Sequence, residues 1–320
     1  MTRNQRSLAA ACVGLSFLSF SRGSPGFSQT DEVEGPWGTV HGDIAGTAAT
    51  EAIPYILGTS VKDAWRLDVR AEGHDRVAGR NPITFDAAGN VYWKSSIGGG
   101  TGGVSRVVSV NPAGDIRWFG NDGAGNVHGL GLFDSTAVVV GRNAAYAVGG
   151  SVDGTLFVAA YKKDSGEVIW ETPLDESAAP DGANGTEALT PVLYRGKLFV
   201  VGVDKGSLVS SEAYQVDAAT GIVDWFTLLD GIQIKMLGQM TLVPDAFGPG
   251  EPGLYLNGDS GNGADGIPEV YGIHLTQDGA ELAWSAEGGK AGRSHLVYSE
   301  VTGTLYAHTW SDYGAQLYTY

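Results

Sequence analysis

The sequence predicts an all-β protein, a β-propeller of about five four-stranded antiparallel sheets. Tryptophans recur along the chain at intervals of 53, 52, 55 and 59 residues, a period typical of one propeller sheet with its loops. The repeated tryptophans are Trp65, Trp118, Trp170, Trp225 and Trp284. The last four follow turns that end in glycine, at Gly114, Gly166, Gly221 and Gly279. The 49 glycines among 320 residues also suit a chain with many tight turns.

The third repeat shows all four expected strands. They cover residues 190–194, 197–203, 211–216 and 223–228, with a turn at 217–221 before the last one. Val, Tyr, Phe and Trp dominate these strands, and Asp, Thr and Gly dominate the turn, as their backbone preferences require. We therefore expect each repeat to form one antiparallel sheet.

The other repeats follow the same order. The first has strands at 82–85, 91–93, 106–110 and 116–119, the second at 137–140, 155–161 and 168–171, the fourth at 240–243, 254–257, 269–273 and 282–285, and the last at 295–298, 304–309 and 316–320. The last repeat lacks a fourth strand. Residues 61–69, around Trp65, have the character of one, and pairing them with the last repeat would close the ring and remove its exposed edges. The alternative is a fragment of a ring of seven or eight sheets.

Each repeated tryptophan is expected to have a structural role. Its ring can lie across the turn glycine of a neighbouring sheet and bury about 200 Å². Glycine leaves room for such an approach.

The first 28 residues have the layout of a secretory signal peptide. Arg3 and Arg6 precede an apolar run at 7–20, which is too short to span a membrane comfortably, and small residues follow. We expect cleavage after Gly26 or Ser28, a propeller domain over residues 33–320, and a secreted or periplasmic protein without a membrane span in the mature chain. An uncleaved anchor is the alternative.

The charge balance excludes some partners. The net charge is −16, and it becomes −19 if the first 28 residues are removed, so nucleic acid and anionic membranes are not expected as partners. Cys12 is the only cysteine and lies within the apolar run. A processed chain would therefore contain no disulfide, no Cys-ligated metal and no Cys nucleophile.

Residues 215–225 (QVDAATGIVDW) resemble the tryptophan-docking repeat of the pyrroloquinoline-quinone-like propellers, matching it at Asp217, Thr220, Gly221 and Trp225. The resemblance implies the propeller fold of that family. The quinone-dependent alcohol and glucose dehydrogenases of the superfamily are longer and typically eight-bladed, and many have adjacent cysteines that this chain lacks. Many other members bind no quinone and act as scaffolds. We therefore expect no quinone and no other obligatory cofactor here.

Candidate ligand-binding residues lie where the loops between sheets would gather around the propeller axis. Aligning the five inner strands places Arg80, His128, Leu189, Gln239 and Arg293 at equivalent positions. Four of them are polar or basic, so this axial mouth could hold a small anion through charge-assisted hydrogen bonds. Alternatively, these side chains only hydrate the mouth.

A second candidate site is the segment 257–266, which is rich in oxygen ligands. Asp259, Asn262 and Asp265 could bind Ca²⁺, which prefers such ligands. The EF-hand spacing is absent, and a glycine-rich hairpin loop is the alternative.

These features together predict an exported, non-enzymatic and monomeric propeller that binds an unknown protein or small-molecule ligand. No catalytic residue is assigned. The alternative is an enzyme with its site at the axial mouth, either a quinone- or metal-dependent oxidoreductase or a glycosidase. Because fold alone does not determine function, the choice depends on the site.

Overall fold

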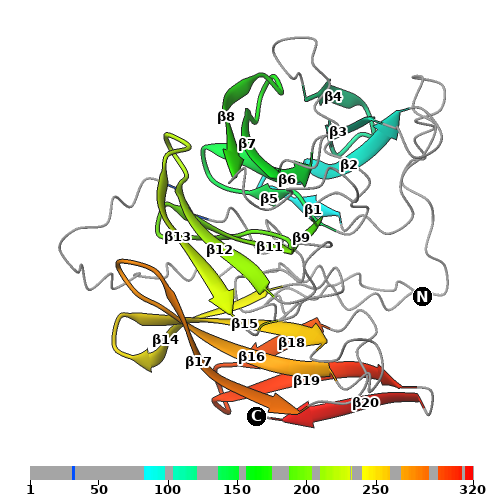
Figure 1. Cartoon of the computed structure of the whole chain (residues 1–320). Helices are drawn as coiled ribbons and strands as arrows, with labels where there is room; N and C mark the ends of the chain where they lie inside the picture. Colours follow the sequence, from blue (N-terminus) through cyan, green and yellow to red (C-terminus); the bar gives the residue numbers. More distant parts are fainter. Residues whose placement is uncertain are drawn as a thin grey trace, which may run out of the picture.

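A computed structural model of the chain defines the fold. It describes residues 31–32, 83–97, 104–120, 136–150, 156–174, 187–203, 210–230, 232, 240–259, 268–287, 295–311 and 314–319. These residues form five antiparallel sheets and no helix (Figure 1). The described part therefore contains no helix long and apolar enough to cross a membrane.

The sheets follow one another along the chain. The first contains β1 (Thr84–Phe85), β2 (Val91–Ile97), β3 (Val104–Val110) and β4 (Ile116–Phe119). The second contains β5 (Val139–Val140), β6 (Ala144–Gly150), β7 (Leu156–Lys162) and β8 (Val168–Leu174). The third contains β9 (Glu187–Ala188), β10 (Val192–Tyr194), β11 (Lys197–Val203), β12 (Ser210–Asp217) and β13 (Val223–Asp230). The fourth contains β14 (Met240–Gly248), β15 (Glu251–Asp259), β16 (Pro268–Leu275) and β17 (Ala280–Glu287), and the fifth contains β18 (His295–Ser299), β19 (Thr304–Ser311) and β20 (Gly314–Thr319).

Within each sheet the strands are paired in sequence order, and only the short β9 departs from this by pairing with β11. Neighbouring sheets touch through their first strands, with contacts from β1 to β5, from β10 to β14 and from β14 to β18. The predicted class, an all-β propeller of four-stranded antiparallel sheets, is confirmed. Residues 61–69, expected to close the ring, lie outside the described residues.

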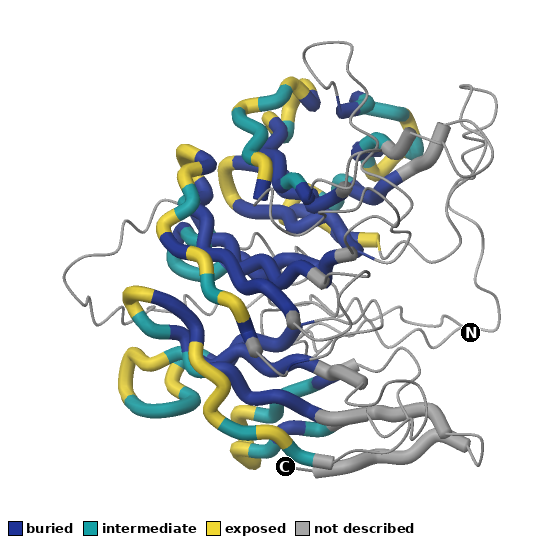
Figure 2. The backbone as a smooth tube through the Cα atoms, viewed as in Figure 1, coloured by how far each residue is buried: buried dark blue, intermediate teal, exposed yellow. Residues whose placement is uncertain are grey.

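Burial follows the position of a strand in its sheet. In the first four sheets most described residues of the middle strands are buried, whereas in the fourth strand β13 exposed residues alternate with buried or half-buried ones (Figure 2). Strands packed on both faces are expected to be apolar throughout, and half-exposed strands to alternate. The run KLFVVGV of β11 and the alternation in β13 fit these two environments.

Strand β6 was absent from the sequence prediction. Its sequence AAYAVGG is rich in alanine and glycine, which have low strand propensity. Its alternate residues face two different cores: Ala145 and Ala147 pack towards the first sheet, and Tyr146 and Val148 towards the third. Small side chains fit here because the strand lies between two sheets.

The repeated tryptophans join one sheet to the next. The indole Nε1–H of Trp118, on β4, donates a 2.8 Å hydrogen bond to the carbonyl of Lys163, and its ring lies against Gly166. In the same way, Trp170 on β8 donates a 3.1 Å hydrogen bond to the carbonyl of Ala218, and its ring lies against Gly221. Each ring thus packs on the turn between the third and fourth strands of the following sheet.

Each tryptophan also packs on an aromatic ring from the second strand of its own sheet. The ring centroids lie 5.7–6.3 Å apart in the pairs Tyr92–Trp118, Tyr146–Trp170, Phe199–Trp225 and Tyr255–Trp284. Trp284 additionally lies across Gly272, its cross-strand partner. The pairing of the tryptophan with an aromatic ring is therefore found in four of the described sheets, and Trp225 also has it.

Replacing Gly221 with alanine tests the packing of the tryptophan on its turn. Gly221 has φ 75°, and a Cβ there would lie 2.6 Å from Trp170 Cδ2. We expect backbone strain of about 1–2 kcal/mol plus overpacking of about 1–3 kcal/mol in the free energy of unfolding. Gly250 is the matched control, since it has φ 81° but no atom within 4 Å of an added Cβ. Equal losses for Gly221→Ala and Gly250→Ala in urea denaturation would contradict the packing contact.

Candidate functional site

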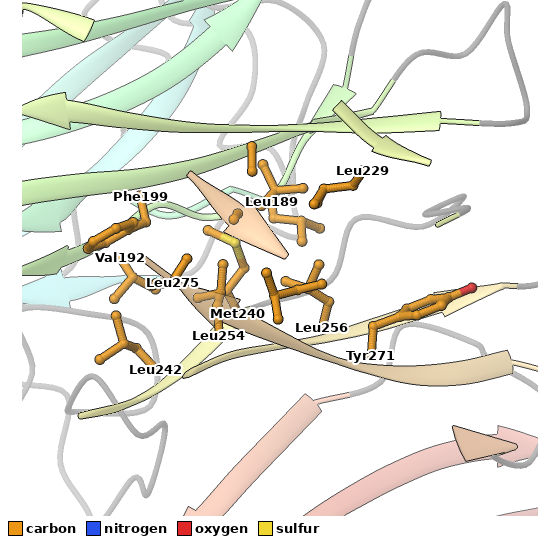
Figure 3. Packing of buried hydrophobic residues seen from close by; sticks show 14 of the residues in the cluster. Leu189, Val192, Phe199, Leu229, Met240, Leu242, Leu254, Leu256, Tyr271 and Leu275 are labelled. Carbon is orange, nitrogen blue, oxygen red and sulfur yellow. The ribbon is translucent and has the colours of Figure 1, made fainter. Parts of the chain in front are cut away.

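The predicted axial-mouth residues Arg80, His128, Gln239 and Arg293 lie outside the described residues. Only the fifth equivalent position, Leu189, is described. It is completely buried in the core between the third and fourth sheets, and its amide donates a 3.0 Å hydrogen bond to the carbonyl of Val201 (Figure 3). Leu189 therefore contributes to packing.

The predicted calcium residues are also mostly outside the described part. Asp259 is the last residue of β15, and Asn262 and Asp265 lie outside the described residues. Among the residues that the structure does describe, no group of three or more His, Cys, Asp or Glu side chains could hold a metal ion.

A cleft of about 320 Å³ lies between the third and fourth sheets. One wall is the β10–β11 hairpin with Tyr194 and Arg195, and the other is the β14–β15 hairpin with Glu251, together with His274 at the end of β16. Phe199 and Leu275, both part of the core in Figure 3, are the apolar floor. In an up-and-down sheet, the hairpin between the first and second strands lies at one end of the sheet. The connection from the fourth strand to the next sheet leaves from the other end. The cleft therefore lies at the end of the sheets away from those connecting strand ends.

The cleft coincides with an exception to the tryptophan packing. Trp225, on β13, should dock on the turn of the fourth sheet, but its buried Nε1–H has no hydrogen-bond partner. A Cβ at Gly279 would meet Thr227 Oγ1 at 2.7 Å, with no atom of Trp225 among its neighbours within 4 Å.

The cause is the length of the β16–β17 hairpin. Pairing continues to Leu275 and Ala280, and the turn is closed by Thr276 N–H donating to the carbonyl of Gly279. In the third sheet pairing ends at Val216 and Val223, which leaves a longer turn whose Ala218 carbonyl accepts from Trp170. The shorter turn of the fourth sheet does not offer Trp225 this acceptor.

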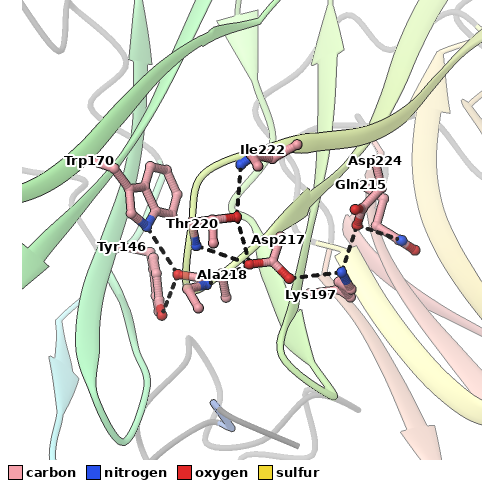
Figure 4. A network of polar contacts seen from close by, with 10 residues as sticks. Tyr146, Trp170, Lys197, Gln215, Asp217, Ala218, Thr220, Ile222 and Asp224 are labelled. Carbon is pink, nitrogen blue, oxygen red and sulfur yellow. Dashed lines mark hydrogen bonds and ion pairs between the residues drawn. The ribbon is translucent and has the colours of Figure 1, made fainter. Parts of the chain in front are cut away.

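The wall of the cleft on the third sheet contains a charge network. Lys197 Nζ lies 2.9 Å from both Asp217 Oδ2 and Asp224 Oδ2, and Gln215 Nε2 donates a 3.0 Å hydrogen bond to Asp224 (Figure 4). Burial alone would lower the pKa of Lys197, but the hydrogen bonds and charges of the two carboxylates outweigh it and raise the pKa. Lys197 is therefore a structural cation whose charge is already matched.

Arg195 is different from Lys197. Its guanidinium lies 4.9 Å from the centroid of the Tyr194 ring, and among the described residues no carboxylate oxygen lies within 4.0 Å of it. The carboxylate of Glu32 accepts a hydrogen bond from the Arg195 backbone amide and acts on the Arg195 charge at longer range. Arg195 has φ 50° and Gly196 φ 72° in the two-residue turn between Tyr194 and Lys197. Positive φ at both central residues defines a type I′ turn, in which Asn, Asp or Gly is strongly preferred at the first position. The arginine is thus held in an unfavourable backbone conformation.

Two further polar groups line the cleft. Tyr194 Oη is buried and has no hydrogen-bond partner, and burial raises the pKa of Tyr194, so the hydroxyl stays protonated as a donor at neutral pH. On the opposite wall, Glu251 is half-exposed, and the imidazole Nε2 of His274 lies 3.9 Å from Glu251 Oε2. The His274 ring lies against Phe247, with centroids 4.8 Å apart.

A short N-terminal segment, Asp31 and Glu32, ties the second sheet to the third near this face. Asp31 is only 2% exposed; its carboxylate accepts from the Tyr146 hydroxyl and the Asn143 amide, and its carbonyl accepts from the Gly196 amide. The carbonyl of Glu32 accepts from the amide of Arg142. The sequence did not indicate this role, because a single Asp in a polar segment belongs to no motif or periodic spacing.

Comparison with protein-family models and with curated protein sequences found no match for this chain. Comparison with solved structures did. Quinohemoprotein alcohol dehydrogenase from Comamonas testosteroni matches 86% of this chain with a TM-score of 0.57 at 15% sequence identity. The match covers 46% of that protein, so this chain spans about half its length.

Two other structures are similar at lower scores. Quinohemoprotein alcohol dehydrogenase ADHIIG from Pseudomonas putida HK5 matches 74% of this chain and 38% of its own, at 13% identity and a TM-score of 0.44. A europium-containing methanol dehydrogenase matches 89% of this chain and 73% of its own, at 11% identity and a TM-score of 0.46.

The comparison corrects two predictions from the sequence. The expectations of a non-enzymatic scaffold and of a chain without quinone are contradicted by the match with the Comamonas testosteroni dehydrogenase. Both expectations relied on the length of the chain and its missing cysteine pair. Neither feature affects how the sheets pack, and the sheets match a quinohemoprotein over most of this chain. What this similarity shows directly is the propeller fold.

The Lys197 network predicts a defined pH dependence of stability. Burial would raise the pKa of Asp217, but hydrogen bonds from Lys197 and Thr220 outweigh it and lower the pKa. A carboxyl with a lowered pKa stabilises the fold above its unfolded pKa, about 4, and this contribution is lost as the pH falls through the folded value.

Asp217→Asn should therefore lower the free energy of unfolding by about 1–2 kcal/mol near neutral pH, with the difference from wild type shrinking below about pH 4. Urea denaturation at several pH values measures this. The control is Asp164→Asn, since Asp164 lies exposed on the corresponding turn of the second sheet. A difference that stays constant down to about pH 3 would contradict the ionised role of Asp217.

Proposed function

We propose that this chain is the propeller of an exported quinone-dependent oxidoreductase, with an alcohol as its class of substrate. The observation that carries the proposal is the match over 86% of the chain with a quinohemoprotein alcohol dehydrogenase. The fold supplies a rigid frame of sheets whose inner strands converge, and function in such folds depends on the loops at the strand ends.

The proposed cofactor site is the axial mouth, at Arg80, His128, Gln239 and Arg293. Pyrroloquinoline quinone carries carboxylates, and basic and amide side chains bind carboxylates through charge-assisted hydrogen bonds. When bound, the quinone would accept the electrons removed from the alcohol. An accompanying Ca²⁺ is proposed at Asp259, Asn262 and Asp265, because their side chains offer the oxygen ligands that Ca²⁺ prefers.

Export is part of the same proposal, with residues 1–28 as a cleaved signal peptide. Cleavage after Gly26 or Ser28 would keep Asp31 in the mature chain. Its buried carboxylate accepts hydrogen bonds from the second sheet, and its carbonyl accepts one from the third. The folded domain is then proposed to start by Asp31, two residues before the boundary that the sequence predicted.

The test is binding of pyrroloquinoline quinone, with and without Ca²⁺, to the mature chain. At 100 times its dissociation constant, a ligand should add about 2.7 kcal/mol to the free energy of unfolding. We expect a thermal shift with the quinone, and alcohol-dependent reduction of an artificial electron acceptor.

Arg80→Gln and Arg293→Gln should each weaken quinone binding, whereas Arg142→Gln, an exposed arginine on the β5–β6 hairpin, should not. Absence of a shift at any quinone concentration, with or without Ca²⁺, would refute the proposed function.

A further inference from the structure

The cleft between the third and fourth sheets has features that the proposed redox site does not use. Its volume of about 320 Å³ is at the lower end of the range for small-molecule sites. It also contains a buried hydroxyl without a hydrogen-bond partner, Tyr194 Oη, and a residue with a strained backbone, Arg195. Unpartnered buried polar groups and strained backbone are expected at functional sites.

The positive group of the cleft is Arg195. Its position in the type I′ turn favours Asn or Gly, so an arginine there strains the backbone. A residue that strains the backbone is often kept for the contacts of its side chain. The guanidinium lies over the Tyr194 ring, and beside it the buried Tyr194 Oη is a donor without an acceptor. Both groups donate hydrogen bonds, and a carboxylate can accept from both.

The negative group is Glu251, on the facing hairpin. It is half-exposed, and the imidazole of His274 approaches it only to the long distance of 3.9 Å. The floor between the two walls is apolar, with Phe199 and Leu275 from the core and Pro252 beside Glu251.

A simple anion does not suit these surroundings. Lys197 is already matched by Asp217 and Asp224, and Asp245 and Glu32 act electrostatically on Tyr194, so carboxylates outnumber free cations near the cleft. A ligand without net charge avoids this repulsion. Opposite charges on facing walls, separated by an apolar floor, match a molecule with a carboxylate at one end, an ammonium at the other and a hydrocarbon side chain.

We propose that this cleft is a binding site for a small zwitterion with an apolar side chain, of the α-amino acid type. Arg195 and Tyr194 bind the carboxylate, Glu251 binds the ammonium group, and the side chain lies on Phe199 and Leu275. The proposal does not depend on the redox function, since none of the residues proposed to bind the quinone lines this cleft.

The first test compares ligands on the unaltered mature chain by isothermal titration calorimetry. L-Phenylalanine and L-leucine should bind at a stoichiometry of one. L-Phenylalaninamide, which lacks the carboxylate, and N-acetyl-L-phenylalanine, which lacks the ammonium, should each bind at least about tenfold more weakly. No heat of binding for either amino acid, or equal affinity for N-acetyl-L-phenylalanine and L-phenylalanine, would overturn the proposal.

The second test separates binding from folding. Arg195→Asn suits the type I′ turn, so this variant should unfold at the same or a higher urea concentration while binding L-phenylalanine about tenfold more weakly or worse. Glu251→Gln should also weaken binding, and Arg142→Gln, on the corresponding hairpin of the second sheet, should leave it within about twofold. Unchanged affinity in Arg195→Asn would refute the role of Arg195.

Discussion

The first three sheets of this protein are joined by a tryptophan at the end of one sheet that packs on the glycine turn of the next. Trp118 on Gly166 and Trp170 on Gly221 each combine a buried ring with an indole hydrogen bond to a turn carbonyl. The contact needs a turn of the right length, a glycine where the ring approaches, and an aromatic residue beneath the indole. Those three requirements account for the period of the sequence, the positions of the turns and the order of the sheets.

Where one requirement is not met, the structure changes locally. The tight turn of the β16–β17 hairpin leaves the Trp225 indole without an acceptor, and the cleft lies at this same junction. Arg195, Tyr194 and Glu251 line it from the two facing hairpins. We infer that an interruption of the repeat created a place for a ligand, while the junctions made by Trp118 and Trp170 keep the tryptophan contact. None of the residues proposed to bind the cofactor lines this cleft, so the two proposed sites are separate.

The sequence predicted the fold well, because the repeat is a property of local pattern. Strands β4 and β11 match their predicted bounds, and most others differ by a few residues at their ends. The strand β6 was missed because its alanines have little strand propensity and are set by packing between two sheets. The contacts of the cleft could not be predicted, since they depend on how two hairpins from different sheets face one another. The spacing of Gly279, five residues before Trp284 where the other repeats have four, was the one sequence signal of the exception.

The most direct test of this account compares Trp118→Phe with Trp225→Phe. Both indoles are buried, 6% and 8% exposed, and both pack on an aromatic ring of the second strand, but only Trp118 donates a hydrogen bond. Removing a satisfied donor should cost about 1–2 kcal/mol more than removing a buried unsatisfied one. Urea denaturation should therefore show a clearly larger loss of unfolding free energy for Trp118→Phe. Equal losses, or a larger loss for Trp225→Phe, would contradict the view that the tryptophan contact is intact at one junction and interrupted at the other.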